Sequence, residues 1–263
     1  MKGKVRVYCR IRPFSKHELE DPEKRLVCYE KTDEMSLRVG SARTKDYNFD
    51  AVFDQDSTQE DVFEDCERLI QSAVDGYNVI IFAYGQTGSG KTFTIQGTED
   101  MPGLTPRAIV KMFDIIREMT NFRIKLKCYM VELYLNHLRD LLLPPGEPVK
   151  ELEIKELAGK TVVQGVTEVE IDSVAQCEEI FTDGLSRRKV RKTMMNAESS
   201  RSHLVFSIII DTANINTGVR NVGKLTFVDL AGSEKASKTG VDKQGQEEAN
   251  AINMSLTALG NVI

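Results

Sequence analysis

The chain has 263 residues and a formal net charge of −5, with 41% hydrophobic and 29% charged residues. This composition is typical of a soluble globular protein. No run approaches the roughly 20 apolar residues of a membrane span, and the first residues alternate in polarity, so we expect no membrane segment and no secretory signal. The acidic balance argues against a general polyanion binder, and we expect no nucleic-acid partner.

Five cysteines are widely spaced and form no C-x-x-C pair. An odd number at such spacing indicates reduced thiols rather than a disulfide framework or a zinc site. The sequence therefore favours a cytosolic or nuclear setting.

The predicted elements begin with "KVRVYCRIRP", where apolar and polar residues alternate as in a half-buried strand. Ser57 and Glu60 form a capping-box pattern that predicts a helix ending near Gly76. "NVIIFAY" predicts a buried strand, and a helix should follow the glycine-rich loop after it. "KLKCYMVELY", "HLVFSIIID" and "KLTFVDLAG" predict further strands, and "PPGEP" predicts a turn. Strands that alternate with helices indicate one α/β domain with a substantial sheet.

The loop after "NVIIFAY" has the spacing of a phosphate-binding loop. Gly85, four residues, and then Gly90, Lys91 and Thr92 match G-x-x-x-x-G-K-[ST] directly after a strand. Glycines let the backbone N–H groups surround a phosphate, the lysine reaches the β- and γ-phosphates, and the threonine hydroxyl can bind Mg²⁺. The alternative is a glycine-rich turn with a solvated lysine, which the preceding strand disfavours.

Two later segments fit the same chemistry. Asp229 ends a strand and Gly232 follows three residues later, where a carboxylate can orient a Mg²⁺-bound water and a glycine N–H can sense a γ-phosphate. "NAESSRSH" places two hydroxyls beside an arginine, although by itself this segment is better interpreted as a hydroxyl-rich loop that caps a strand. No Asn-Lys-x-Asp guanine reader occurs, so we favour an adenine nucleotide.

Together these segments resemble the kinesin motor domain. The matching motifs are "GQTGSGKT", "NAESSRSH" and "DLAGSE", with "RIRP" near the start and "INMSLTALGNVI" at the end. The resemblance runs from about residue 4 to the last residue, and it extends to the C-terminal-motor (minus-end-directed) kinesins, especially the kinesin-like calmodulin-binding proteins.

The resemblance implies the fold of a P-loop NTPase of the kinesin-motor type. We expect an α/β architecture with a central mixed, mostly parallel sheet and helices on both faces. Residues 1–263 are expected to form a single, partial motor domain with its phosphate loop at 85–92, its first switch at 196–203 and its second switch at 229–234. The implied activity is ATP hydrolysis coupled to movement on microtubules, with ATP and Mg²⁺ as cofactors.

The resemblance also implies which residues bind the nucleotide. The adenine pocket is expected to contain Arg10, Arg12 and Pro13, with Phe93 stacked on the base unless it is simply a core aromatic. The phosphates are expected to contact Gln86, Thr87, Gly88, Ser89, Gly90, Lys91 and Thr92. Mg²⁺ is expected to bind Thr92 and Ser200, and Asp229 through water.

The catalytic residues that the resemblance implies are Asn196, Ser199, Ser200, Arg201, Gly232 and Glu234. Among them, Ser199 and the Gly232 N–H should position the attacking water. Arg201 and Glu234 should form a salt bridge that closes the two switches around the γ-phosphate. His203 is expected to be a packed residue rather than a proton carrier.

The implied partner is the acidic surface of the microtubule. The residues expected to bind it are Lys155, Lys160, Lys235, Lys238 and Asn253. The basic run "RRKVRK" at 187–192 is interpreted as a solvated helix end. Met254 stands where the family commonly has lysine, which weakens a salt-sensitive attraction.

Kinesin motors continue beyond "SLTALGNVI" with further track-binding elements, a strand inside the central sheet and a last long helix. Without that strand, the first strand and the phosphate-loop strand would lose a neighbour, at a cost on the order of a few kcal/mol per unpaired buried group. We therefore expect residues 1–263 alone to be marginally stable.

The sequence also leaves open two other functions, namely a non-motile kinesin-derived protein and a P-loop ATPase with another task. A homodimer would form through a coiled coil outside these residues, and we expect a cytoplasmic location on the microtubule cytoskeleton.

Overall fold

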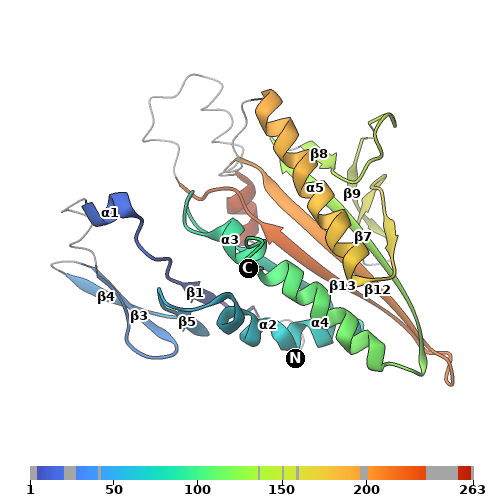
Figure 1. Cartoon of the computed structure of the whole chain (residues 1–263), viewed down its shortest axis with the longest axis horizontal. Coiled ribbons are helices and arrows are strands. Elements are labelled where there is room, and N and C mark those ends of the chain that lie inside the picture. The colour runs from blue at the N-terminus through green and yellow to red at the C-terminus, as the bar shows by residue number, and fades with distance from the viewer. Residues whose placement is uncertain are drawn as a thin grey trace. The chain divides into compact units, whose positions relative to one another are not determined.

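The structure is a computed structural model (Figure 1). It describes residues 5–20, 28–40, 43–135, 137–149, 151–157, 160–195, 201–234 and 254–261. The described residues fall into two compact units, one extending to Asp65 and the other beginning at Cys66. Each unit is described by itself.

The first unit contains two small sheets. Strand β1 (Tyr8–Arg10) pairs in parallel with β5 (Ala51–Phe53), and helix α1 (Lys16–Glu20) follows β1. Strands β2 (Cys28–Lys31), β3 (Ser36–Gly40) and β4 (Thr44–Asn48) form an antiparallel sheet. The alternating segment at the start of the chain is therefore a strand, shorter than its polarity pattern suggests.

Helix α2 (Gln59–Val74) confirms the predicted helix but not its cap. The Asp61 N–H donates to the Thr58 hydroxyl, and the Thr58 N–H donates to the Asp61 carboxylate. The capping box thus lies one residue later than the predicted pair of Ser57 and Glu60, because the Ser57 hydroxyl donates to Asp54 instead.

The second unit is built on a six-stranded sheet with the order β11-β7-β12-β13-β6, in which β8 also pairs with β7. Its strands are β6 (Asn78–Ala83), β7 (Phe122–Tyr134), β8 (His137–Asp140), β11 (Val169–Ile171), β12 (His203–Asn214) and β13 (Arg220–Asp229). The four strands that the sequence predicts in this region are all members of this sheet.

The expectation of a mostly parallel sheet is wrong for this part of the chain. Only β13 and β6 pair in parallel, whereas the remaining neighbours in the sheet are antiparallel. Short connections explain two of these pairs, because β12 and β13 are joined by residues 215–219 and β7 and β8 by residues 135–136. Such short links allow only antiparallel neighbours, since a parallel pair needs a crossover of a dozen or more residues.

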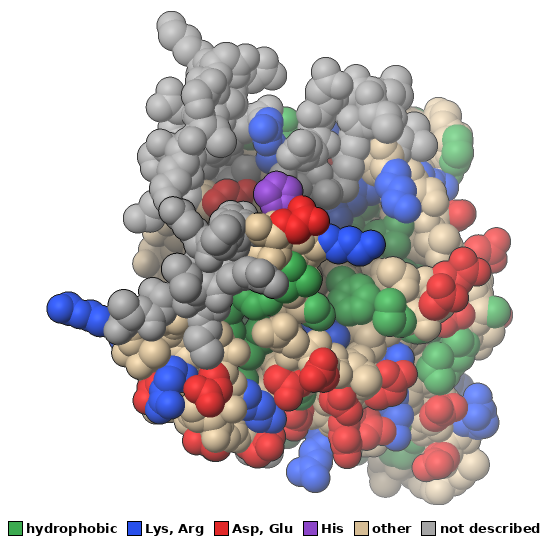
Figure 2. All heavy atoms as spheres, turned by 60° about the vertical axis from the view of Figure 1, so that its left-hand side comes forward, with side chains coloured by type: hydrophobic (Ala, Val, Ile, Leu, Met, Phe, Trp, Pro, Cys, Tyr) green, Lys and Arg blue, Asp and Glu red, His purple; other side chains and the backbone are tan. Residues whose placement is uncertain are grey.

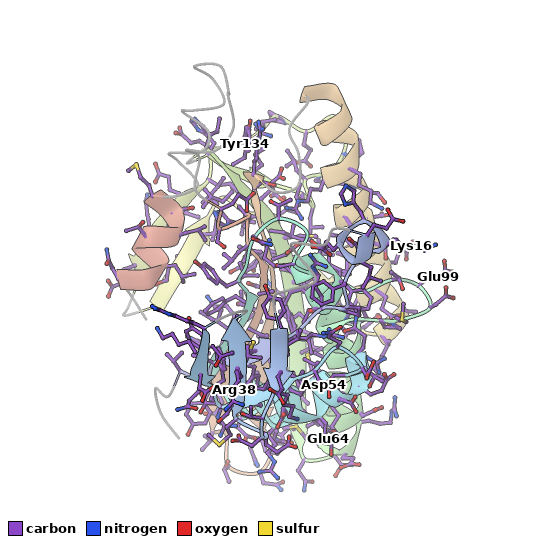
Figure 3. The ribbon with its side chains drawn as sticks, turned by 90° about the vertical axis from the view of Figure 1, so that its left-hand side faces the viewer. Lys16, Arg38, Asp54, Glu64, Glu99 and Tyr134 are labelled. Atoms are coloured by element: carbon purple, nitrogen blue, oxygen red, sulfur yellow. The ribbon has the colours of Figure 1, made fainter. Side chains whose placement is uncertain are left out.

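Helices cover both faces of this sheet. Helices α3 (Lys91–Ile95), α4 (Leu104–Glu118) and α5 (Val174–Met195) accompany it, and α4 and α5 lie side by side. Figure 3 shows α5 on one side of the strands and the helix formed by residues 254–261 on the other. A hairpin of β9 (Glu153–Leu157) and β10 (Lys160–Gln164) completes the unit. No helix in the described ranges is long and apolar enough to cross a membrane.

Strand β12 carries the core of this unit. Its residues Leu204, Phe206, Ile208 and Ile210 are at most 2% exposed, and the Phe206 ring lies 5.0 Å from that of Phe181 on α5. The strand has apolar side chains on both faces, which is the pattern of a strand covered on both sides.

Strand β6 ends the sheet on one side, and Ile80 on this strand is 61% exposed. A terminal strand presents unpaired backbone N–H and C=O groups that can pair with another segment. The expectation that the chain alone is marginally stable stays a prediction.

Candidate nucleotide-binding site

The glycine-rich loop connects β6 to α3 as the sequence predicts. Gly88 and Gly90 have φ values of 75° and 95°, a left-handed conformation that is strained for other residues. A Cβ atom added at either glycine would meet nothing within 4 Å, so the inner side of the loop is open. The loop therefore offers accessible backbone to a ligand.

Lys91 lies over this loop. Its ammonium group donates to the carbonyl oxygens of Gly85 and Gln86, each at 2.9 Å. Partial burial lowers the pKa of Lys91, while the carboxylates of Asp229 and Glu234 act in the opposite direction. A cation thus stands between the loop and two acidic residues of the second switch.

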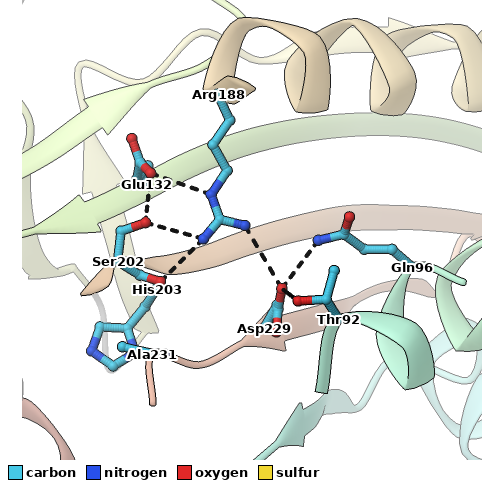
Figure 4. A network of polar contacts seen from close by, with 8 residues as sticks. All are labelled: Thr92, Gln96, Glu132, Arg188, Ser202, His203, Asp229 and Ala231. Atoms are coloured by element: carbon cyan, nitrogen blue, oxygen red, sulfur yellow. Dashed lines mark hydrogen bonds and ion pairs between the residues drawn. The ribbon is translucent and has the colours of Figure 1, made fainter. Parts of the chain in front are cut away.

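Asp229 connects the end of β13 to the helix after the loop (Figure 4). Its Oδ2 atom accepts from the Thr92 hydroxyl at 2.7 Å and from the Gln96 amide at 3.1 Å. Its Oδ1 atom is buried and has no hydrogen-bond partner among the described residues. A buried, unpartnered carboxylate oxygen beside a hydroxyl fits Mg²⁺, which prefers oxygen ligands.

Arg188 on α5 joins this cluster from the opposite side (Figure 4). Its guanidinium lies 3.2 Å from the Glu132 carboxylate and 3.7 Å from Asp229, and these three side chains are at most 5% exposed. It also donates to the carbonyl and the hydroxyl of Ser202, at 3.1 and 3.0 Å. One buried cation therefore links β7, the end of the first switch and the start of the second.

This arrangement corrects the interpretation of "RRKVRK" as a solvated helix end for its first two residues, whereas Lys189 is exposed as expected. Arg188 is 3% exposed, and Arg187 donates to the carbonyl oxygens of Leu141 and Leu143. Sequence analysis missed Arg188 because a run of basic residues is usually exposed. The available signal was Glu132 inside the apolar strand "YMVELY", since a buried carboxylate requires a cation or hydrogen-bond donors.

Glu234 lies on the phosphate loop. One carboxylate oxygen accepts from the Thr87 N–H at 2.8 Å, and the other accepts from the Thr87 hydroxyl. Burial acts to raise the pKa of Glu234, but these hydrogen bonds outweigh it and the pKa lies below its usual value. Glu234 thus contacts the backbone that the sequence assigns to phosphate, and its pair with Arg201 stays a prediction.

Gly232 lies directly between these groups. A Cβ atom at this position would overlap Thr87 Oγ1 and the Glu234 carboxylate, so no larger residue fits without displacing them. The second switch therefore approaches the phosphate loop closely, as its expected role in sensing phosphate requires.

His203, the first residue of β12, is 7% exposed and bonded through both ring nitrogens. Nδ1 accepts from the Ala231 N–H at 3.1 Å, and Nε2 lies 2.8 Å from the Ser255 hydroxyl. Burial, assisted by the positive charge of Arg188, lowers the pKa of His203 from 6.5 to about 4. The packed role expected for this residue is confirmed, whereas its two hydrogen-bond partners were not predicted.

This pKa predicts an acid sensitivity. Between pH 6.5 and about 4 the unfolded chain binds a proton at His203 that the folded chain does not. The contribution to stability is complete above pH 6.5 and is lost as the pH falls through this window, by up to about 3 kcal/mol. Urea unfolding of wild type and His203→Gln across this range should show a slope shallower in the variant by up to about 1.4 kcal/mol per pH unit. Equal slopes would contradict the expectation.

The residues expected to contact adenine are in the first unit. Arg10 donates to the Gln59 side chain at 2.7 Å and to the Ser57 carbonyl at 3.3 Å. Arg12 forms a bidentate salt bridge with Glu18, with N–O distances of 2.7 and 2.6 Å. Pro13 is exposed. The structure therefore shows both guanidinium groups held in place, and their role toward a base stays a prediction.

Several other predicted site residues lie outside the described ranges, namely Asn196, Ser199, Ser200, Lys235, Lys238 and Asn253. Phe93 is half-buried on α3, which leaves its stacking role a prediction.

Lys155 on β9 pairs with Glu153 at 2.7 Å, and Lys160 begins β10. On the face that Figure 2 shows, acidic and basic side chains of the described residues are intermixed, without a continuous basic surface.

Comparison with known proteins decides the family. The model of the kinesin motor domain matches residues 10–263. The chain belongs to the kinesin motor domain family. The resemblance inferred from the switch and loop motifs is thereby confirmed, and with it the α/β kinesin-motor fold.

Individual kinesins agree with this assignment. Kinesin-like protein KIN-14I of Oryza sativa subsp. japonica is 49% identical over 265 residues, which cover all of this chain and 21% of that protein. A solved structure of a fast kinesin superimposes with a TM-score of 0.87 at 35% identity, covering 97% of this chain and 73% of that one. The C-terminal motor domain of Kar3 from Candida glabrata gives 0.82 at 33% identity, covering 99% and 80%. These relatives support the C-terminal-motor subfamily. The chain spans about a fifth of the curated relative's length.

Proposed function

We propose that this kinesin-family chain is an ATP-hydrolysing motor domain that couples ATP turnover to microtubule binding and movement. The observation that carries the proposal is the contact between the phosphate loop and the second switch. Thr92 of the loop bonds to Asp229, and Thr87 of the loop bonds to Glu234. These contacts support one site in which a bound phosphate group would alter the position of the switch.

Different residues have different roles in phosphoryl transfer, which requires mainly positioning and charge stabilisation. The backbone of the loop and the Lys91 ammonium bind the phosphates. Thr92 and Asp229, with Ser200, would hold Mg²⁺, and the fit rests on the unpartnered Asp229 oxygen. When bound, Mg²⁺ supplies positive charge to the phosphate oxygens.

Switching follows from competition between a phosphate group and the Glu234 carboxylate for the Thr87 N–H. A phosphate group at the loop would accept the Thr87 N–H bond that the Glu234 carboxylate now accepts. The displaced carboxylate would then pair with Arg201 and close the two switches, with Ser199 and the Gly232 N–H placed to position the attacking water. Asn196 would contact the closed switch.

The proposed partner is the microtubule, with Lys155, Lys160, Lys235, Lys238 and Asn253 on the contacting surface. The proposed location is accordingly the cytoplasm, on the microtubule cytoskeleton. Dimerisation through a coiled coil beyond these residues would be compatible with this function.

One observation favours a second candidate, a non-motile microtubule-binding protein that retains the nucleotide site. Met254, where the family commonly has lysine, is 67% exposed on the helix of residues 254–261. An exposed methionine cannot supply the electrostatic attraction of a lysine toward an acidic surface. This candidate differs from the first in lacking coupling between nucleotide and track.

Steady-state ATPase assays with increasing microtubules test the proposal. We expect turnover that rises with microtubule concentration and disappears when EDTA removes Mg²⁺, together with nucleotide-dependent co-pelleting. Pelleting that is equal in every nucleotide state would favour the non-motile candidate. Failure to pellet in any state, with ATPase retained, would indicate a P-loop ATPase with another task.

A further inference from the structure

The strongest unassigned feature is the hydrogen-bonded bridge through the His203 ring. One ring nitrogen lies against the second switch at Ala231, and the other against Ser255 on the helix of residues 254–261. His203 itself is the last residue of the first switch and the first residue of β12. A single side chain thus touches elements that are 28 and 52 residues away in sequence.

The direction of both hydrogen bonds follows from the donors. The Ala231 backbone N–H can only donate, so Nδ1 must carry a lone pair. In a neutral imidazole the proton is then on Nε2, which donates to the Ser255 hydroxyl oxygen. The hydrogen bond from the Ala231 N–H therefore fixes the tautomer of the ring, and with it the direction of the hydrogen bond to Ser255.

The position of Ala231 makes this bridge relevant to the nucleotide site. Ala231 lies between Asp229, which bonds to Thr92, and Gly232, which contacts Thr87 and Glu234. Any displacement of the second switch that follows phosphate binding must move the Ala231 N–H. Because Ala231 is completely buried and His203 nearly so, water has little access to replace the lost bond.

The other end of the bridge lies on a helix with an exposed face. Ser255 is half-buried and adjoins Met254, which is 67% exposed. This helix covers the face of the sheet opposite α5 (Figure 3). The Ser255 hydroxyl ties this helix to the first residue of β12.

We propose that His203 is a positioning residue that couples the second switch to the helix of residues 254–261 through Ser255. The inference rests on the proposed function, in which that helix belongs to the microtubule-facing surface. When the second switch moves, the His203 ring follows the Ala231 N–H and carries the Ser255 hydroxyl with it. Removal of the hydroxyl uncouples the helix from the switch while leaving the phosphate loop intact.

The test compares Ser255→Ala with Ser255→Thr, which keeps a hydroxyl at the same position. Basal ATPase of both variants should stay within about twofold of wild type. Microtubule stimulation should fall about tenfold in Ser255→Ala and be retained in Ser255→Thr, a change within the usual range of coupling between sites. A purely structural role would instead lower basal and stimulated turnover together. Equal stimulation of Ser255→Ala and wild type would overturn the proposal.

The wild-type measurement distinguishes a failure of this inference from a failure of the proposed function. Wild-type ATPase without microtubule stimulation contradicts the motor function, whatever the variants do. The bridge itself is tested on the unmutated chain by ¹⁵N NMR of its histidines, where His203 should show a protonated Nε2 and an unprotonated Nδ1. Protonation of Nδ1 in the folded chain would overturn the bridge even if Ser255→Ala failed to fold.

Discussion

Replacing Arg188 with methionine is expected to lower the free energy of unfolding by about 3–5 kcal/mol. The substitution retains much of the apolar stem but removes the charge that lies 3.2 Å from Glu132 and 3.7 Å from Asp229. Both carboxylates are at most 5% exposed, so water cannot replace the lost cation. Since total stabilities are about 5–15 kcal/mol, urea unfolding should show a much lower midpoint or a largely unfolded protein.

Arg187→Met is the matched control for this prediction. Arg187 adjoins Arg188 on the same helix, but among the described residues it donates to two backbone carbonyls and pairs with no carboxylate. Its loss should cost about 1–3 kcal/mol, the penalty of unsatisfied carbonyl groups. Adding Glu132→Gln to Arg188→Met should recover part of the loss, because one uncompensated carboxylate remains instead of two. If Arg188→Met unfolded like the control, the central role of the cation would be refuted.

The strands of the larger sheet were predictable because their apolar runs are long and end in recognisable motifs. "HLVFSIIID" and "KLTFVDLAG" become β12 and β13, and the phosphate loop follows β6 as its motif requires. The order and direction of the strands could not be predicted from these runs. Short connections account for the antiparallel pairs β12–β13 and β7–β8. The pairs of β7 with β11 and β12 are also antiparallel, although long segments join these strands, so the connection length alone does not predict the mostly antiparallel sheet.

Local sequence also left the start of α2 ambiguous. Ser57 with Glu60 and Thr58 with Asp61 are overlapping capping patterns. The choice between them depends on Asp54, whose carboxylate accepts the Ser57 hydroxyl and so leaves Thr58 as the cap. Boundaries of this kind are decided by a few hydrogen bonds and shift by a residue easily.

The chemistry of the site was predictable from motifs, but its internal connections were not. Asp229 and Thr92 were both identified as Mg²⁺ candidates, and the structure places them 2.7 Å apart. The Arg188 cluster and the His203 bridge join residues that lie 14 to 56 positions apart, where no periodicity or spacing rule applies. Such contacts exist only once the sheet has formed, so a charge run or a single histidine gives no hint of them.

The largest effect on activity is expected from Arg201→Ala and Glu234→Ala, each of which should reduce ATP hydrolysis by at least about 100-fold. Nucleotide binding should change little, because Lys91 and the loop backbone remain. In this structure Glu234 accepts from Thr87, and in the proposed mechanism its carboxylate exchanges that partner for Arg201 before hydrolysis. Single-turnover hydrolysis and binding of a fluorescent ATP analogue measure the two effects separately.

The double variant decides whether these residues act as one device. If a single salt bridge closes the switches, Arg201→Ala with Glu234→Ala should be no slower than either single variant, since residues that act as a unit are strongly non-additive. Arg220→Ala is the control, because Arg220 pairs with Asp211 at the opposite end of β13 and should leave turnover unchanged. Normal hydrolysis by Arg201→Ala would contradict the switch assignment. Multiplying losses in the double variant would show two independent roles, with Glu234 acting through Thr87 rather than through the arginine.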